Sequence, residues 1–254
     1  MWGRPGKQGV PFTYYGRLVG IPASYTLAPG AAYHKLDVFY DLAHDHLHQV
    51  CEGAHPDFGV QLYSYSMVFF GEDVLTGLRL LHGLYMGFLE SAVLLSGAVV
   101  PGMLAADPRF SVRNFYQGLA PGGPVEQAER LLEGTEGARL LVDSELASAV
   151  LPDGSEWDRT EGYARNYHRH PEIALDDPRR FLVRSGDVPS HELLYYYRDR
   201  RRPRLSPDAT LLQLSQVNDK SAAPNLPHYQ ASVGLIQRCL ERSQAALINP
   251  PVPA

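Results

Sequence analysis

The hydrophobic positions of the chain repeat with two different spacings, which predict strands and helices in turn. Runs rich in aromatic and β-branched residues predict a strand over 12–21 and a strand or hairpin arm over 60–70. Between them, an apolar stripe at helical spacing predicts a helix over 31–52. The members of this stripe are Leu36, Phe39, Ala43, Leu47 and Val50. A long apolar segment then predicts a second helix over 72–94.

The second half of the chain continues this alternation with shorter elements. A strand is expected over 96–104, and because it carries Gly and Pro we expect it at a sheet edge or a bulge. A short helix over 124–133 has Pro near its start, and an apolar strand over 138–143 follows. The remaining elements are a hairpin from strands at 181–185 and 192–198, and helices over 211–217 and 228–247.

This order of elements predicts an α+β fold. Alternating strands and helices favour a mostly antiparallel sheet with helices on one face, and the order is that of a ferredoxin-like, split βαβ core. We divide the chain into a flexible arm, a core, an irregular insertion, a C-terminal hairpin with helices that complete the same domain, and a tail. Their boundaries are 1–11, 12–150, 151–180, 181–248 and 249–254.

Composition and charge narrow the classes of function. The 254 residues are 44% hydrophobic and carry 23 basic against 28 acidic side chains, for a net charge of -5. These values are ordinary for a globular protein, and the mild negative charge argues against a general nucleic-acid binder. A basic run at 198–204 follows three tyrosines, but Pro203 interrupts it. We therefore expect a solvated loop or a protein contact there, and no nucleic acid.

Cysteine usage and hydropathy indicate a cytoplasmic protein without a membrane span. Cys51 and Cys239 lie too far apart in sequence for a metal knuckle, and we expect two reduced, buried thiols. The first residues contain no apolar segment of the kind found in signal peptides. The most apolar stretch, 74–100, is interrupted by charged and polar side chains, so it is expected to form a buried helix and a strand.

A histidine-rich segment raises the question of a metal site. Asp37, Asp41, His44 and His48 share one face of the helix predicted over 31–52. A His pair four residues apart can hold Zn²⁺. That face points away from the apolar stripe, however, which favours a solvated surface or a subunit contact. We predict no metal site.

Several short segments of the chain have counterparts, in the same order, in a known family. They are YGRLVG at 15–20, YSYS at 63–66, SGAV at 96–99 with Gly102, GP at 123–124, RLLVD at 139–143 and Tyr229. In this order and spacing the chain resembles the class III type of nucleotide cyclase domain, most closely the bacterial pyrimidine cyclases of anti-phage Pycsar systems. The resemblance covers about 12–245 and implies the cyclase fold and a dimer.

The chain departs from this family at the residues that perform the chemistry. The family's Asp residues on the first two strands hold divalent cations, which neutralise the triphosphate and activate the ribose 3′-hydroxyl. Arg17 and Tyr65 occupy the matching positions, and Ser96 replaces the arginine of the third strand. An arginine repels a cation and cannot ligate one. The resemblance therefore implies a catalytic site that has degenerated, with no cofactor.

Three hypotheses of function follow. In the first, a cyclase-like pseudoenzyme acts by binding, as a nucleotide sensor or a dimer scaffold in bacterial defence or signalling, with itself or a cyclase-like chain as partner. Its expected ligand-binding residues are Arg17, Tyr65, Ser66, Gly97 and Gly102. Arg17 would pair with a phosphate without a cation; the alternative is that it pairs with an acid or lies exposed on an edge.

The second hypothesis is an active nucleotidyl cyclase whose Mg²⁺ or Mn²⁺ ligands have moved. Glu72 and Asp73 are the candidate carboxylates, because they follow the second predicted strand directly. Their alternative role is to stabilise the start of the following helix through its dipole. A third possibility is a protein that uses the fold only for assembly.

Overall fold

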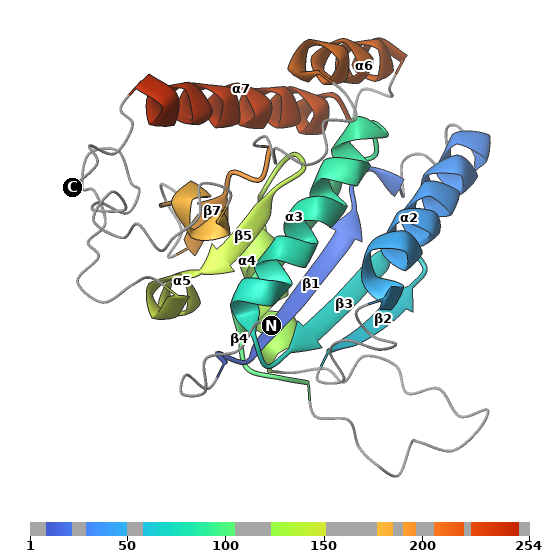
Figure 1. The fold of residues 1–254 in the computed structure, drawn as a ribbon. Coiled ribbons are helices and arrows are strands. Elements are labelled where there is room, and N and C mark those ends of the chain that lie inside the picture. The colour runs from blue at the N-terminus through green and yellow to red at the C-terminus, as the bar shows by residue number, and fades with distance from the viewer. Residues whose placement is uncertain are drawn as a thin grey trace.

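The fold is built on one seven-stranded sheet (Figure 1). The computed structural model describes residues 9–21, 29–49, 58–104, 123–150, 177–184, 190–196, 206–220 and 225–248. The strands are β1 (Phe12–Leu18), β2 (Gly59–Tyr63), β3 (Ser66–Gly71), β4 (Leu95–Pro101), β5 (Leu140–Asp143), β6 (Leu182–Arg184) and β7 (Ser190–Leu193). The helices are α2 (Pro29–Gln49), α3 (Val74–Glu90), α4 (Pro124–Leu132), α5 (Ser144–Val150), α6 (Pro207–Lys220) and α7 (Leu226–Ile248), with a 3-10 turn at Pro178–Phe181.

The first six elements form a ferredoxin-like core. They follow the order β1-α2-β2-β3-α3-β4, and the strands lie side by side as β2-β3-β1-β4, with every pair antiparallel. β5 then pairs in parallel with β4, and β7 and β6 extend the sheet in antiparallel fashion. The predicted α+β class with a mostly antiparallel sheet is therefore confirmed.

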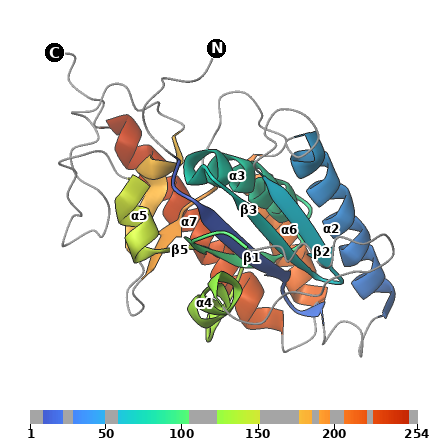
Figure 2. The same cartoon turned by 90° about the horizontal axis from the view of Figure 1, so that it is seen from below.

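The helices divide between the two faces of the sheet. α2 and α3 cover one face, and α4 lies on the other (Figures 1 and 2). The prediction placed helices on one face, so α4 is an exception to it. α4 buries Val125, Ala128, Leu131 and Leu132 against residues that include Tyr15 and Val68. α7 crosses the end of the sheet at which β1 finishes (Figure 1).

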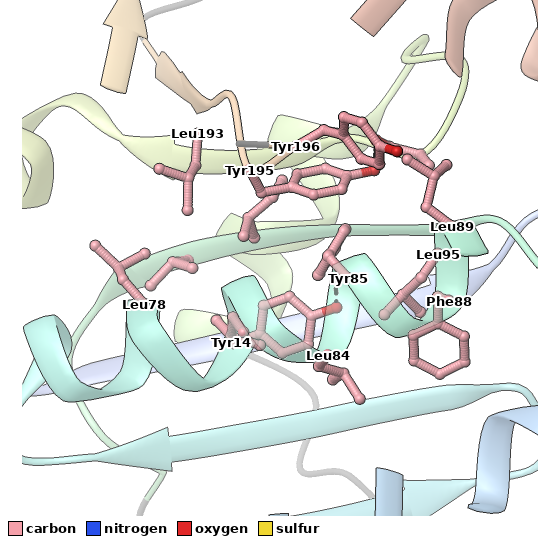
Figure 3. Close-up of a cluster of buried hydrophobic side chains, with 14 of the residues drawn as sticks. Tyr14, Leu78, Leu84, Tyr85, Phe88, Leu89, Leu95, Leu193, Tyr195 and Tyr196 are labelled. Carbon is pink, nitrogen blue, oxygen red and sulfur yellow. Dashed lines mark hydrogen bonds between the residues drawn. The ribbon is translucent and has the colours of Figure 1, made fainter. Parts of the chain in front are cut away.

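Tyrosines occupy the centre of the core on the α3 face (Figure 3). The hydroxyls of Tyr14 and Tyr85 hydrogen-bond at 3.0 Å, and the rings of Tyr85 and Tyr195 meet edge-on, 4.8 Å apart. Burial raises the pKa of all three phenols, which therefore stay neutral donors. Gly16 and Gly97, paired across β1 and β4, make room for the Tyr14 ring, because a Cβ on either would overlap it.

One predicted element has a different place in the sheet. β4 was expected at an edge or a bulge, and this prediction is wrong: β4 lies between β1 and β5 and is buried along nearly its whole length. Gly97 packs under Tyr14, and Pro101 is the last residue of the strand, so neither interrupts the ladder at its middle. The segment predicted over 60–70 is a hairpin, β2 and β3, and α5 was not predicted.

Other predictions are settled only where the chain is described. The apolar stretch at 74–100 forms α3 and β4, as expected, and Cys239 is a buried, reduced thiol whose pKa burial raises to about 12. The arm at 1–8, Cys51, most of the insertion, the basic run at 198–204 and the tail lie outside the described residues. None of the helices in the described segments has the length and apolar character needed to cross a membrane.

Candidate functional site

Three side chains predicted to take part in the site stand in a row across the sheet. Arg17 near the end of β1 lies directly opposite Ser66 on β3 and directly opposite Ser96 on β4. Directly opposed residues of antiparallel strands present their side chains on the same face, about 5 Å apart from strand to strand. The face is the one on which α4 lies, since Tyr15 and Val68 belong to it. We call these three residues the Arg17 row.

Arg17 is the exposed member of this row. α4 covers Tyr15, which is 7% exposed, but leaves Arg17 two positions further along the strand open to solvent. Within the described part of the chain, the Arg17 guanidinium makes no hydrogen bond and no ion pair. The expected alternative of an exposed arginine is thus observed, on a central strand of the sheet and not on an edge.

The two serines of the row are partly or wholly shielded from water. Ser66 Oγ lies 3.5 Å from the Tyr15 hydroxyl. Burial raises the pKa of Tyr15 and the nearby Glu129 carboxylate raises it further, while the Ser66 contact and the charge of Arg17 lower it. Ser96 is 6% exposed, and its hydroxyl oxygen is buried with no hydrogen-bond partner among the described residues. Buried hydroxyls without partners are uncommon, and a bound water or ion, or a catalytic role, is among their explanations.

Tyr65 does not join the row with its side chain. It occupies the two-residue turn between β2 and β3, and its carbonyl oxygen accepts a 2.8 Å hydrogen bond from the Leu18 amide. Its ring is partly buried against the core on the α2 and α3 side of the sheet. The backbone of Tyr65 is therefore beside the end of β1, while its side chain is on the face opposite to Arg17.

The two predicted glycines are not brought together. Gly97 follows Ser96 in β4, but its Cα faces the core, where the Tyr14 ring fills the space a side chain would need. Gly102 lies past the other end of β4, with φ +96, and its carbonyl accepts a 2.8 Å hydrogen bond from Thr13 Oγ1. A phosphate cradle spanning these glycines is therefore not formed, and the packing of Tyr14 accounts for Gly97.

The candidate carboxylates lie at the far end of the same strands. β3 runs from Ser66, opposite Arg17, to Gly71, opposite Phe12, which places Glu72 and Asp73 roughly 16 Å or more from the row. Asp73 caps α3, accepting a 3.1 Å hydrogen bond from the Leu75 amide. Asp73 therefore acts at the helix start as a hydrogen-bonding cap, while the first turn of α3 itself contains no acidic residue.

A histidine that the sequence analysis did not single out lies near Arg17. His228, in the first turn of α7, accepts a 3.1 Å hydrogen bond from the Gly137 amide on Nδ1. Burial lowers the pKa of His228, the charge of Arg17 lowers it further, and Glu136 opposes the change. His228 is therefore neutral near pH 7, with its proton on Nε2. No local pattern predicts this neighbour, because the tertiary fold alone brings α7 to the end of β1.

The histidine face of α2 has the features of a solvated surface. The rings of His44 and His48 stack 4.3 Å apart, and His48 Nδ1 donates a 2.7 Å hydrogen bond to the His44 carbonyl. Across the described segments, no cluster of three or more His, Cys, Asp or Glu side chains could hold a metal ion.

Comparisons with known proteins add two distant likenesses. No protein-family model matches the chain, and no curated protein matches it. A structure of adenylate cyclases from Trypanosoma brucei in their monomeric state has a TM-score of 0.44 and 10% identity, covering 59% of this chain and 79% of that chain. The crystal structure of the guanylyl cyclase Cya2 has a TM-score of 0.39 and 12% identity, covering 63% and 89%. Likenesses of this strength establish no shared function.

Proposed function

We propose that this protein is nucleotide-cyclase-like, and that it binds a nucleoside triphosphate or a related phosphorylated ligand without cyclising it. The observation that carries the proposal is the position of Arg17. It stands in a row with Ser66 and Ser96, exposed and without an ionic partner in the described segments, where the resembling enzymes have a metal-binding aspartate.

The chemistry of the Arg17 row suits a phosphate. A guanidinium presents parallel N–H donors that match two phosphate oxygens, and its charge needs no intervening cation. Ser66 and Ser96 flank Arg17 on the neighbouring strands, whose backbones lie about 5 Å from that of β1. A phosphate bound by Arg17 would thus have the partly exposed Ser66 as a neighbouring donor, while the Ser96 hydroxyl is buried.

The same residues argue against cyclisation. Attack of the 3′-hydroxyl on the α-phosphate in the resembling enzymes depends on divalent cations held by carboxylates. Arg17 places a positive charge where the first of these carboxylates is expected, which disfavours a cation there. Glu72 and Asp73, the candidates for relocated ligands, are at the other end of β3. We therefore propose no metal and no cofactor for this site.

The resemblance also supports a partner. Sites of the class III type form across two chains, so the proposal includes a second copy of this protein or a cyclase-like chain as partner, in bacterial defence or signalling. The alternative is a cyclase-like protein that binds no ligand and serves only as a scaffold for its partner.

Isothermal titration with each of the four ribonucleoside triphosphates tests the binding half of this proposal. Mass spectrometry of the products after incubation with Mn²⁺ or Mg²⁺ tests the catalytic half. We expect at least one triphosphate to bind and no cyclic nucleotide to appear. A cyclic product would contradict the loss of catalysis, and the absence of heat with all four triphosphates would contradict nucleotide binding.

A further inference from the structure

The turn that precedes Ser66 has an unusual backbone. Tyr63 and Ser66 are paired in the β2–β3 ladder, so Ser64 and Tyr65 form a two-residue hairpin loop. Such loops require a positive φ at their first central position, which glycine, asparagine or aspartate usually supplies. Here Ser64 has φ +47. A side chain that is not glycine is strained in this region, and such a conformation persists only where surrounding contacts hold it.

A contact from α2 holds this turn. The Tyr40 hydroxyl donates a 2.8 Å hydrogen bond to the carbonyl oxygen of Ser64. Tyr40 is itself positioned by the core, because its ring meets the fully buried Phe39 ring edge-on at 5.5 Å, and Phe39 packs against Phe88 of α3 at 5.8 Å. The strained residue is thus tied to a helix that packs on α3.

The turn in its own right is tied to the candidate site. The Tyr65 carbonyl accepts a 2.8 Å hydrogen bond from the amide of Leu18, the residue that follows Arg17. Ser66, the first residue of β3, lies directly opposite Arg17. Movement of the turn would therefore displace Ser66 and the end of β1 together.

We propose that Tyr40 is a positioning residue, which holds the strained turn at Ser64 and thereby fixes Ser66 and Arg17 relative to each other. The consequence for ligand affinity rests on the proposed function, whereas the consequence for the backbone does not.

The test uses the full chain and the Tyr40→Phe variant, which removes only the hydroxyl. Amide hydrogen exchange by NMR is measured at Leu18, with the Gly97 amide, bonded to the Arg139 carbonyl at 2.8 Å, as an internal reference. Loss of one hydrogen bond is expected to speed exchange at Leu18 by roughly two- to tenfold and to leave Gly97 unchanged. Tyr33→Phe, at an exposed tyrosine of the same helix, is the matched control.

A second substitution separates positioning from general destabilisation. Glycine adopts a positive φ without strain, so Ser64→Gly in the Tyr40→Phe background is expected to restore slow exchange at Leu18. The same pair of variants is titrated with the triphosphate that the wild-type protein binds most tightly. We expect affinity to fall with Tyr40→Phe and to recover with Ser64→Gly.

Each result decides the proposal. Unchanged exchange at Leu18, or equal acceleration at Gly97 that Ser64→Gly does not reverse, would overturn it. Faster exchange with unchanged affinity would overturn the role of Tyr40 in positioning the site. If the wild-type protein binds no triphosphate, the proposed function fails, and the exchange at Leu18 alone decides whether Tyr40 holds the turn.

Discussion

Arg17 on β1 and Ser96 on β4 lie directly opposite each other in an antiparallel ladder, on the face of the sheet that α4 covers only in part. One of them is an exposed cation and the other a buried hydroxyl, and neither has a hydrogen-bond partner among the described residues. The charge of Arg17 and the hydroxyl of Ser96 thus lie on neighbouring strands, at the end of the sheet that α7 crosses (Figure 1). In the proposed function, an anionic ligand would neutralise the exposed Arg17.

Removing the guanidinium is expected to weaken ligand binding. Hydrogen bonds to charged groups contribute about 1.5–3 kcal/mol, so Arg17→Ala should lower triphosphate affinity by roughly 10- to 100-fold. The measurement is isothermal titration of wild type and variant. Arg184→Ala, at an exposed arginine on β6 several strands away, is the control. Equal losses in the two variants would show that Arg17 acts only through overall charge.

The glycine pair under Tyr14 predicts a packing effect on stability. Gly16→Ala would force its Cβ into the Tyr14 hydroxyl, which should lower the free energy of unfolding by about 1–3 kcal/mol. The same substitution in a Tyr14→Ala background should cost much less, because the obstructing ring is gone. Gly30→Ala is the control, since nothing lies within 4 Å of its added Cβ. Additive effects of Gly16→Ala and Tyr14→Ala in urea denaturation would refute this explanation.

A buried carboxylate shared by two arginines predicts a larger loss. Glu192 is 1% exposed and accepts two hydrogen bonds from Arg139, at 2.9 and 3.0 Å. It also forms an ion pair with Arg238 at 3.1 Å. Glu192→Ala removes the buried carboxylate of these ion pairs, and we expect a loss of about 3–5 kcal/mol in the free energy of unfolding.

The control for Glu192→Ala is an exposed ion pair. Glu126 lies 3.5 Å from Arg130 on the surface of α4, and Glu126→Ala should cost less than about 1 kcal/mol. Chemical denaturation of both variants checks the contrast. A loss at Glu192 no greater than at Glu126 would mean that the buried carboxylate contributes nothing beyond a surface charge.

His191 predicts a dependence of stability on pH. Burial, with a contribution from Arg184, lowers the pKa of this 2% exposed histidine from 6.5 to about 4, against the opposing effect of Asp143. Between these values the unfolded chain binds a proton that the folded chain does not. The contribution of His191 is therefore fully present above about pH 6.5 and is lost as the pH falls toward about 4, on the order of 3 kcal/mol in total.

Denaturation curves at a series of pH values measure this dependence. His191→Gln removes the titrating group and should flatten the decline in stability between about pH 6.5 and 4. His44→Gln, on the exposed face of α2, is the control substitution. An unchanged slope in His191→Gln would assign the acid sensitivity to other groups.

The sequence predicted more of the fold than of the candidate site. Strand and helix periodicities locate the six elements of the core, because each buries one face. The central place of β4 could not be predicted, since Gly97 and Pro101 are typical of an edge and only the Tyr14 ring explains the glycine.

Within the site, the partners Arg17 and Ser96 follow from strands that the sequence located. Tyr65 lies in the two-residue turn before Ser66, and its ring packs on the other face of the sheet, a placement that the sequence pattern does not indicate. His228 reaches the site only through the packing of α7 on the Gly137 amide, which has no signal in the local sequence.

The effect of Mg²⁺ on triphosphate affinity tests the central claim most directly. In the proposed function the ligand phosphates would meet the Arg17 guanidinium, and added Mg²⁺ would compete with Arg17 for the same oxygens. We predict that the affinity measured by isothermal titration is equal or lower in millimolar Mg²⁺ than in EDTA, and that Arg17→Ala weakens binding in EDTA. Tight binding that requires Mg²⁺ and survives Arg17→Ala would contradict the account.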